Sequence, residues 1–259
     1  IVSSGYDLRA INLEKGGSGR LTLNRGSSIN ATTVTAGTLT VAEGGNLGGG
    51  RPLAVAAGAT FEWARAGTFS SPISGAGRIV RSTTAGNSLF SGNNAAFSGD
   101  WYVSAGSVGL VSDASLGAAT VGMTLDGGGI YLLADGGTLA GSRTITLGPD
   151  GGTLDGFAGN TQTFAAVFTG SGPLRKAGGA RAILTAANGF AGGTTIVGGT
   201  LVAASQHALG TGALSVEAGG RLELAAGIDL RVGGMAVDGG LVELGGSGLD
   251  LWVASETSH

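Results

Sequence analysis

Cysteine is absent from this chain of 259 residues, and proline occurs only four times. The lack of cysteine excludes disulfide bonds and thiolate metal sites, while the scarcity of proline leaves most backbone N–H groups able to join β-ladders. Charged residues make up 12% of the chain, and the formal net charge is −3. Because the 14 basic residues are spread thinly, they form no stripe that could neutralise phosphates, which argues against a nucleic-acid partner.

Other absences narrow the chemistry further. No run of about eighteen apolar residues occurs, so we expect no transmembrane helix. Residues 1–10 lack the basic and apolar regions of a signal peptide, so we expect that it was removed or that the chain is an internal fragment. His207 is the only internal histidine, since His259 ends the chain, and a catalytic base there would need a nucleophile and an orienting acid.

Glycine, by contrast, supplies 54 residues. Disorder requires low hydrophobicity and high net charge, whereas the mean hydropathy here is +0.31, so we interpret the glycines as turn residues. Helical spacing is nearly absent, apart from one turn that Gln206–Leu209 would make, and the pattern predicts an all-β chain. Glycine turns followed by short alternating apolar strands occur at residues 15–23, 35–41, 126–133, 135–140, 150–155, 197–203, 218–224 and 238–244.

A long-range repeat decides between the all-β folds. Phe97–Gly117 aligns without gaps with Phe190–Gly210, and looser copies extend over residues 75–133 and 170–224. Copies that return the chain to the same lateral position stack in register and form parallel sheets, which predicts a parallel β-helix with coils of roughly 20–25 residues. No linker or composition shift marks a boundary, so we expect residues 1–259 to form a single β-helical domain or a fragment of one.

The repeat also assigns side chains to the inside and the outside of the coils. Phe97 and Phe190 align and are expected in the core, and Asn188 is expected at a corner, where its amide satisfies turn backbone groups. Asn94 lies one position out of register with Asn188, which predicts that the asparagine ladder is not continuous. Thr194 is placed on the outer face. The predicted core residues of the second copy are Leu174, Leu184, Ile196 and Leu201.

Residues 170–201 resemble the passenger-associated transport repeat of bacterial autotransporters. The first half of that pattern is met by Gly170, Gly172, Leu174, Lys176 and Gly178. The second half is met by Asn188, Phe190, Gly192, Gly193, Thr194, Thr195, Ile196, Gly198, Gly199, Thr200 and Leu201. The chain departs from the family pattern at Ala180, Ala182 and Ala186, where glycine, leucine and glycine are more usual. These departures weaken one strand and leave the turns intact.

The resemblance implies an autotransporter passenger domain folded as a right-handed parallel β-helix. Such a passenger passes through the periplasm and reaches the bacterial cell surface, or is secreted, with the help of its own C-terminal outer-membrane β-barrel translocator. Residues 248–259 lack repeated amphipathic strands of about ten residues, so we expect the translocator outside this chain. Because the family includes adhesins, self-aggregating proteins, cytotoxins, proteases and esterases, membership leaves the activity open.

Each candidate site for catalysis, metal or cofactor has a simpler structural interpretation. His207 aligns with Ala114 in the repeat, so we interpret it as a turn residue. Residues 245–253 match one copy of a calcium-binding β-roll motif with Asp250 as the ligand, but calcium binding there needs tandem copies. Residues 75–80 begin like a dinucleotide fingerprint, yet a valine replaces the last glycine and no helix follows, which favours a strand-to-strand turn. We therefore predict no catalytic residue, no metal ligand and no cofactor.

Acidic pairs and aromatic rings are the remaining candidates. Two acidic pairs could converge for acid–base chemistry, although scattered acids on a solvated face are the simpler interpretation; they are Glu217 with Glu223, and Glu243 with Asp250. Aromatic rings are better candidates for contact with a ligand if they are exposed, with core packing as the alternative. These rings belong to Trp63, Trp101, Tyr102, Tyr131 and Trp252.

These observations favour a non-enzymatic, surface-exposed or secreted passenger that mediates adhesion or self-association. Its expected partners are a host-surface or matrix molecule, or another copy of itself. The alternative is a β-helical stalk that carries a separate hydrolase or toxin domain outside this chain.

Overall fold

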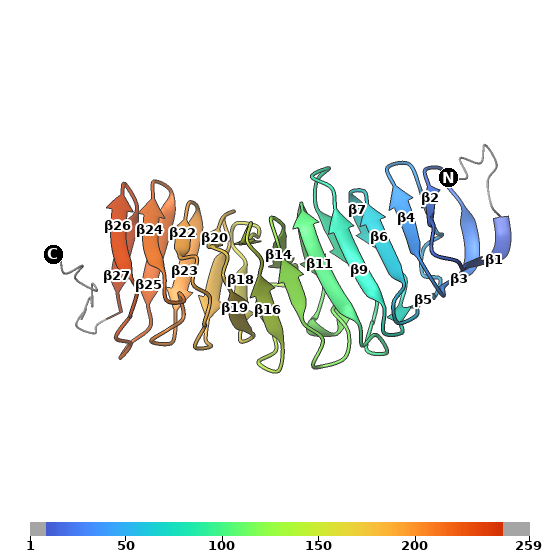
Figure 1. The fold of residues 1–259 in the computed structure, drawn as a ribbon. Coiled ribbons are helices and arrows are strands. Elements are labelled where there is room, and N and C mark those ends of the chain that lie inside the picture. The colour runs from blue at the N-terminus through green and yellow to red at the C-terminus, as the bar shows by residue number, and fades with distance from the viewer. Residues whose placement is uncertain (1–8, 246–259) are drawn as a thin grey trace. The chain divides into compact units, whose positions relative to one another are not determined.

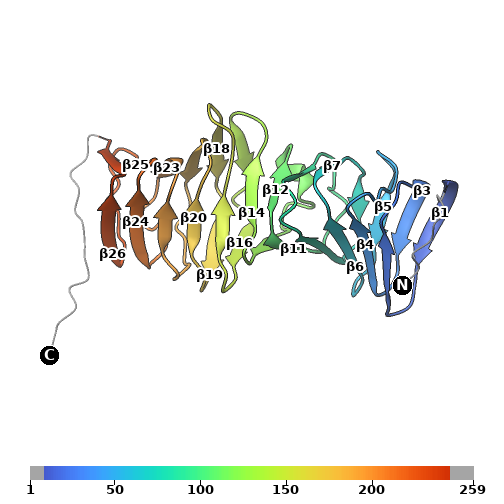
Figure 2. The ribbon, with the colours of Figure 1, turned by 90° about the horizontal axis from the view of Figure 1, so that it is seen from above.

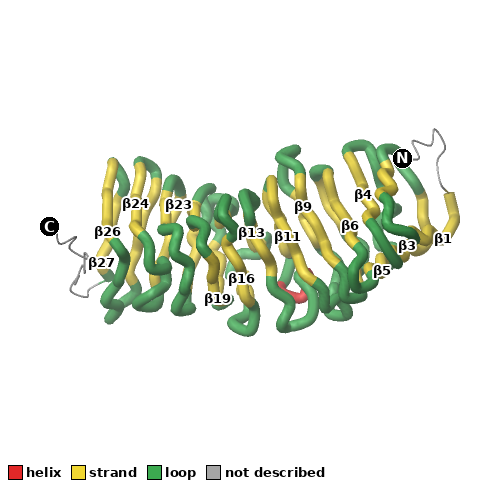
Figure 3. The backbone as a smooth tube through the Cα atoms, viewed as in Figure 1, coloured by secondary structure: helices red, strands yellow, loops and turns green. Residues whose placement is uncertain are grey.

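The computed structural model describes residues 9–245. In this range the chain is built from β-strands, and η1 (Asp113–Ser115) is the one helical element, drawn in red in Figure 3. No helix in the described range has the length and apolarity to cross a membrane. The chain separates into two compact units, an N-terminal unit of residues 1–124 and a C-terminal unit of residues 125–259.

Strands of successive coils lie side by side in the N-terminal unit, and their pairs are parallel (Figure 1). One sheet contains β1 (Arg9–Lys15), β3 (Ser28–Val34), β5 (Leu53–Val55) and β8 (Ile73–Ser74). A second contains β2 (Arg20–Leu23), β4 (Thr38–Ala42), β6 (Thr60–Ala64), β9 (Arg78–Ser82) and β11 (Asp100–Ala105). A third contains β7 (Gly67–Phe69), β10 (Ser88–Phe90) and β12 (Ser107–Leu110). Arg20 pairs with Thr38, and Thr38 with Thr60, so these two coils are 18 and 22 residues long.

The C-terminal unit is also made of parallel strand pairs (Figure 2). One sheet contains β14 (Gly129–Leu132), β17 (Gly152–Leu154), β20 (Leu174–Lys176), β22 (Thr194–Ile196), β24 (Ala213–Glu217) and β26 (Gly234–Asp238). Another contains β15 (Gly137–Leu139), β18 (Thr161–Phe164), β21 (Arg181–Leu184), β23 (Gly199–Ala203), β25 (Gly220–Leu224) and β27 (Leu241–Leu244). In addition, β16 (Thr144–Leu147) pairs with β19 (Val167–Gly170). The sequence boundary between the units falls in β13 (Met123–Leu125).

The predicted all-β, parallel β-helical fold is confirmed. Its core follows from the period of two, because alternate side chains of each strand point to opposite faces. In β21, for example, Ala182 and Leu184 are fully buried, while Arg181 and Ile183, which alternate with them, are partly exposed. The predicted core residues Leu174, Leu184, Ile196 and Leu201 are all fully buried. That residues 1–259 form one domain stays a prediction.

Aromatic rings fill much of the core of the N-terminal unit. Phe90 packs edge-on against Trp101, with ring centroids 4.8 Å apart, and Phe97 contacts the same indole from 6.2 Å. Phe97 and its repeat partner Phe190 are fully buried, as predicted. Trp63 is also buried and stacks edge-on with a phenylalanine at 5.0 Å. These rings therefore serve packing within the coils.

The prediction that Thr194 faces outward is wrong. Thr194 is buried, and its hydroxyl donates a hydrogen bond of 2.9 Å to the carbonyl of Leu209. In the aligned copy, Trp101 takes the place of Thr194, and its indole N–H donates a bond of 2.7 Å to the carbonyl of Leu116, the partner of Leu209. Both side chains point inward because a buried carbonyl at the following turn needs a hydrogen-bond donor.

Candidate binding surface

Two asparagines hold neighbouring coils together at the predicted corners. Asn188 is buried; its Oδ1 atom accepts a bond of 2.8 Å from the N–H of Phe168, and its Nδ2 atom donates one of 2.6 Å to the carbonyl of Ala208. Asn94 is also buried and bonds in the same way to the coils before and after its own, at 2.8 and 2.5 Å. The single-residue offset between the copies therefore leaves the role of the asparagine unchanged.

Two buried lysines tie turns to the following coil. The Nζ atom of Lys176 donates hydrogen bonds to the carbonyls of Ala177, Gly178 and Gly198, at 2.5, 3.1 and 3.1 Å. Lys15 makes the matching three bonds, at 2.7, 2.8 and 2.9 Å. Burial lowers the pKa of Lys176 to about 8, so its ammonium group still predominates at neutral pH and its three donors meet three acceptors. We call each arrangement a lysine socket.

Arg81 fills the corresponding place in the copy near residues 75–133. Its side chain is fully buried, and its Nη2 atom donates a bond of 2.6 Å to the carbonyl of Gly86. A glycine in the left-handed region lies at the edge of each of the three sites: Gly37 at φ 67°, Gly106 at φ 65° and Gly199 at φ 63°. A Cβ atom on Gly199 would lie 2.5 Å from the carbonyl oxygen of Gly178, so only glycine allows the next coil to approach this closely.

His207 lies in a turn, as the repeat predicts. The N–H of Asn188 donates a 3.0 Å bond to the backbone carbonyl of His207, and the N–H of Asn94 donates a 3.0 Å bond to the carbonyl of Ala114. The two aligned residues thus make the same contact through their backbones, which any residue can supply. Residues 206–209 form the expected turn.

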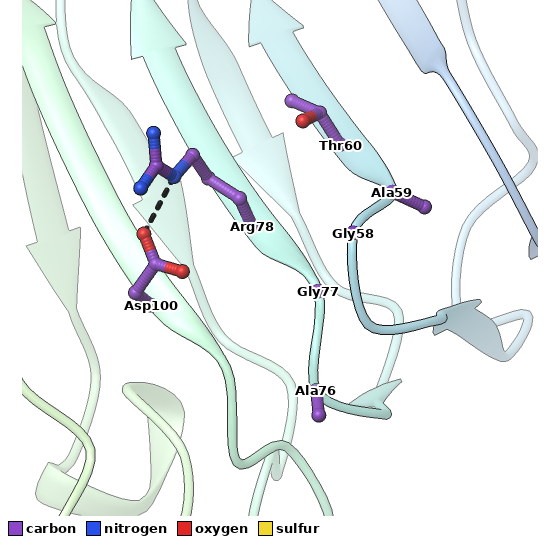
Figure 4. Close-up of a pocket in the computed structure, with 7 residues that line it drawn as sticks. All are labelled: Gly58, Ala59, Thr60, Ala76, Gly77, Arg78 and Asp100. Carbon is purple, nitrogen blue, oxygen red and sulfur yellow. Dashed lines mark hydrogen bonds and ion pairs between the residues drawn. The ribbon is translucent and has the colours of Figure 1, made fainter. Parts of the chain in front are cut away.

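A pocket with a volume of about 250 Å³ opens on the N-terminal unit (Figure 4). It is lined by Gly58, Ala59, Thr60, Ala76, Gly77, Arg78 and Asp100. The Nε atom of Arg78 donates a hydrogen bond of 2.6 Å to Asp100, and both side chains are more than half exposed. The predicted strand-to-strand turn at residues 75–80 joins β8 to β9 and forms one wall of this pocket. A Cβ atom on Gly77 would lie 2.5 Å from a backbone oxygen, so the wall at this point has no side chain.

The pocket lies on a row of polar residues that crosses five paired strands. The members of this row, which we call the Arg20 row, are Arg20, Thr38, Thr60, Arg78 and Asp100. Glu62 belongs to the neighbouring row, and its carboxylate accepts bonds from Ser82 and Thr40, at 2.5 and 2.8 Å, and pairs with Arg20. Burial raises the pKa of Glu62, but these hydrogen bonds outweigh burial and hold the pKa below its usual 4.5.

Arginines and glutamates cover part of the second sheet of the C-terminal unit. Arg181 in β21 pairs with Glu223 in β25 at 2.7 Å, and Arg221 pairs with Glu223 at 3.2 Å and also with Glu243. Two of the acids singled out from the sequence are therefore held by arginines. Glu217, the expected acid–base partner of Glu223, ends β24.

Most of the singled-out aromatic rings are packed inside. Trp63, Trp101 and Tyr131 are buried, and Tyr102 is half-buried. Within residues 9–245, an exposed ring is found at Phe157, which has an exposed fraction of 53% and stands edge-on to Tyr131 with centroids 5.6 Å apart. Sequence reasoning missed Phe157 because its loop, between β17 and β18, has no period from which the direction of a side chain can be predicted.

Several candidates lie outside the described residues. They are Asp250, the calcium-like motif from residue 246 onward, Trp252 and His259. Within residues 9–245, no group of three or more His, Cys, Asp or Glu side chains could hold a metal ion. The prediction that the chain has no catalytic, metal-binding or cofactor-binding residue stays a prediction.

Comparison with known proteins fits the repeat geometry. The passenger-associated-transport-repeat family matches residues 13–41 and 174–203. The adhesin BmaC autotransporter of Brucella suis biovar 1 (strain 1330) is 39% identical to this chain over 99 residues. These matches show that the chain carries the passenger-associated transport repeat and support an autotransporter passenger domain. The alignment covers 35% of this chain and 3% of that relative, and no solved structure matches the chain significantly.

The two matched ranges are those that contain the lysine sockets. The copy at residues 13–41 was missed from the sequence, although Leu13, Lys15 and Gly17 repeat the spacing of Leu174, Lys176 and Gly178. The copy near 75–133 lies outside both matches, and there arginine replaces lysine. Passenger domains of this family are exported through the periplasm to the cell surface or secreted, and their partner is a C-terminal translocator.

Proposed function

We propose that this passenger is the non-enzymatic part of an adhesin and binds its partner through the outer faces of its coils. The observation that carries the proposal is the arrangement of outward polar side chains in register across successive strands, as in the Arg20 row. The name of the Brucella relative, an adhesin, supports the same role.

Rows of this kind suit multivalent binding. Paired strands lie about 4.8 Å apart, so each row presents donors and acceptors at a fixed short interval along the stack. The second sheet of the C-terminal unit offers another such row, in which Thr161, Arg181, Thr200 and Arg221 are paired in register and at least partly exposed. Many weak contacts add up to useful avidity without an enclosed pocket. A host-surface or matrix molecule, or a second copy of the passenger, would form hydrogen bonds with the polar side chains of several successive strands on such a face.

The proposal of a non-enzymatic role draws on the position of the single internal histidine. His207 contributes a backbone carbonyl to its turn, as the aligned Ala114 does. The structural repeat therefore explains why a residue is needed at this position, and no catalytic role for the imidazole is required. The acids Glu223 and Glu243 are engaged by arginines.

Adhesion can be tested on beads that carry the passenger. Since the chain has no cysteine, Thr161→Cys on the outer face of β18 allows a polyethylene glycol chain to be attached at that site alone. Thr185→Cys, at an exposed position directly after β21, is the matched control. We expect wild-type beads to bind epithelial cells or matrix-coated wells, or to clump with each other, and the modified Thr161→Cys beads to lose that binding while the control beads keep it. Beads that bind neither surface and do not clump would contradict the proposal.

The stalk alternative is favoured by one comparison. The aligned region is 3% of the Brucella relative, so nearly all of that protein has no counterpart in the alignment. A stalk predicts that the purified passenger neither binds nor self-associates, while a longer natural chain carries a hydrolase or toxin activity. Sedimentation velocity on the purified passenger, together with the sequence of the complete reading frame, separates the two.

A further inference from the structure

We propose that the pocket lined by Arg78 and Asp100 binds one sugar unit of an uncharged glycan. The inference rests on the proposed adhesive function and names the chemical class of its ligand. The pocket, its ion pair and the Thr60 hydroxyl beside it supply the geometry (Figure 4).

The ion pair makes the pocket neutral but leaves it rich in hydrogen-bonding atoms. Arg78 uses its Nε atom on the Oδ2 atom of Asp100. Within residues 9–245, the two terminal nitrogens of Arg78, the Oδ1 atom of Asp100 and the hydroxyl of Thr60 have no further partner. The terminal nitrogens of Arg78 are donors and the Oδ1 atom of Asp100 is an acceptor. Together they can bind adjacent sugar hydroxyls, because each hydroxyl both donates and accepts a hydrogen bond. An anionic ligand is disfavoured because the carboxylate of Asp100 already neutralises Arg78 and would repel a second negative charge.

The size of the pocket fits a ligand of this scale. Its volume of about 250 Å³ lies below the roughly 300–1,000 Å³ of sites for drug-sized molecules. Four of the seven lining residues are turn residues that have small side chains or none, namely Gly58, Ala59, Ala76 and Gly77. A single pyranose ring therefore matches the space better than a peptide side-chain cluster.

The β-helical repeat does not require this ion pair. Val103, which pairs with Arg81, is aligned with Ile196, which pairs with Lys176. Three residues before each of these positions, Asp100 therefore corresponds to Gly193, and Arg78 corresponds to Pro173. Exposed ion pairs also contribute little to stability. Since neither the repeat pattern nor stability explains this ion pair, a role in ligand binding is the explanation that we propose for it.

The Arg20 row extends the site along the stack. Thr60 and Thr38 follow Arg78 in register on the two preceding coils. A glycan chain that places one ring in the pocket can therefore continue over these hydroxyls, at an interval of about 4.8 Å per coil.

Saturation-transfer-difference NMR on the full 259-residue chain tests the proposal. The probes are methyl α-mannoside, methyl β-galactoside, N-acetylglucosamine and glucuronate. We expect at least one neutral probe to bind and its affinity to fall about ten-fold in Arg78→Met, since a hydrogen bond to a charged group is lost. Arg51→Met, an exposed arginine of the same unit outside the pocket, should bind like the wild type. Asp100→Asn should shift preference toward glucuronate, because Arg78 then lacks its counter-charge.

Four results would overturn the inference, three of them in the binding assay and one in the bead assay. One is the absence of binding by every neutral probe. Another is binding that survives Arg78→Met, and the third is a wild-type preference for glucuronate, which would make the pocket an anion site. Circular dichroism of each variant checks that the fold is kept. Beads carrying Arg78→Met that still adhere to cells would reject the glycan pocket and leave the adhesive function standing, whereas wild-type beads that fail to adhere would reject that function itself.

Discussion

Gly199 provides a sharp test of how the lysine sockets shape the fold. Gly199→Ala would keep φ near +63°, in the left-handed region, at a cost of about 1 kcal/mol relative to glycine. The new Cβ atom would also lie 2.5 and 2.6 Å from the carbonyl oxygens of Gly178 and Ala180. Relieving those contacts moves β23 away from the preceding coil, and overpacking of this kind costs about 1–3 kcal/mol. We expect a total loss of about 2–4 kcal/mol.

Gly136→Ala is the matched control in the same unit. Gly136 has φ +71°, is exposed, and a Cβ atom there would meet no atom within 4 Å. Only the backbone term applies, so we expect a loss of about 1 kcal/mol.

Urea unfolding followed by far-UV circular dichroism gives the stability of each variant. Hydrogen exchange with mass spectrometry shows where coils open, which matters because the coils of a solenoid couple mainly to their neighbours. We expect faster exchange in β20–β23 for Gly199→Ala alone. If Gly136→Ala and Gly199→Ala lose equal stability, the close approach in the socket is not what requires glycine.

Four further substitutions and one spectrum test the assignments. Leu201→Asp buries a charge among apolar side chains and should lower the free energy of unfolding by several kcal/mol. Thr194→Asp should also lower the melting temperature clearly, because Thr194 is buried. An unchanged melting temperature for either variant would contradict the assignment of that residue to the core. Glu62→Gln should destabilise the protein above about pH 4.5. The difference in stability from the wild type should vanish as the pH falls through the lowered pKa of Glu62, because the carboxylate of the wild type is then protonated as well. Urea unfolding at a series of pH values between about 2 and 6 measures the difference. His207→Ala should change stability by less than about 0.5 kcal/mol and leave bead adhesion intact, and a loss of adhesion or of a hydrolytic activity would refute the turn assignment. The circular dichroism spectrum should be dominated by β-structure, and a spectrum with a third of the residues helical would contradict the fold.

The fold was predictable because its determinants are local and periodic. Glycine turns and alternating apolar residues mark strands without knowledge of the partner strands, and Leu174 and Leu201 were assigned to the core on that basis. Thr194 shows where residue type misleads, because the period of two places it on the same inward face as Ile196, and its polar side chain is satisfied there by the carbonyl of Leu209, 15 residues later. The alignment of Thr194 with Trp101 contained the missing signal, since an indole in that position is more easily read as buried.

The pocket could be only partly foreseen. Residues 75–80 were singled out as a turn, but the partner of Arg78 is Asp100, 22 residues away. Coil lengths of 18 and 22 residues in the same sheet show that the spacing varies, so a sequence pattern cannot decide which two residues become neighbours.

The pair between Arg181 and Glu223 links strands that are not neighbours. Ile183 pairs with Val202 and Val202 with Glu223, so β23 lies between the two charged residues. A solenoid held only by adjacent contacts frays one coil at a time, because each boundary opens independently. A side chain that reaches over one coil to the next adds a contact beyond nearest neighbours, so the opening of β21 becomes coupled to that of β25. The coupling is small, because a partly exposed ion pair contributes at most about 1 kcal/mol. Removing it with Glu223→Gln should therefore make amide exchange in β21 and β25 slightly less concerted.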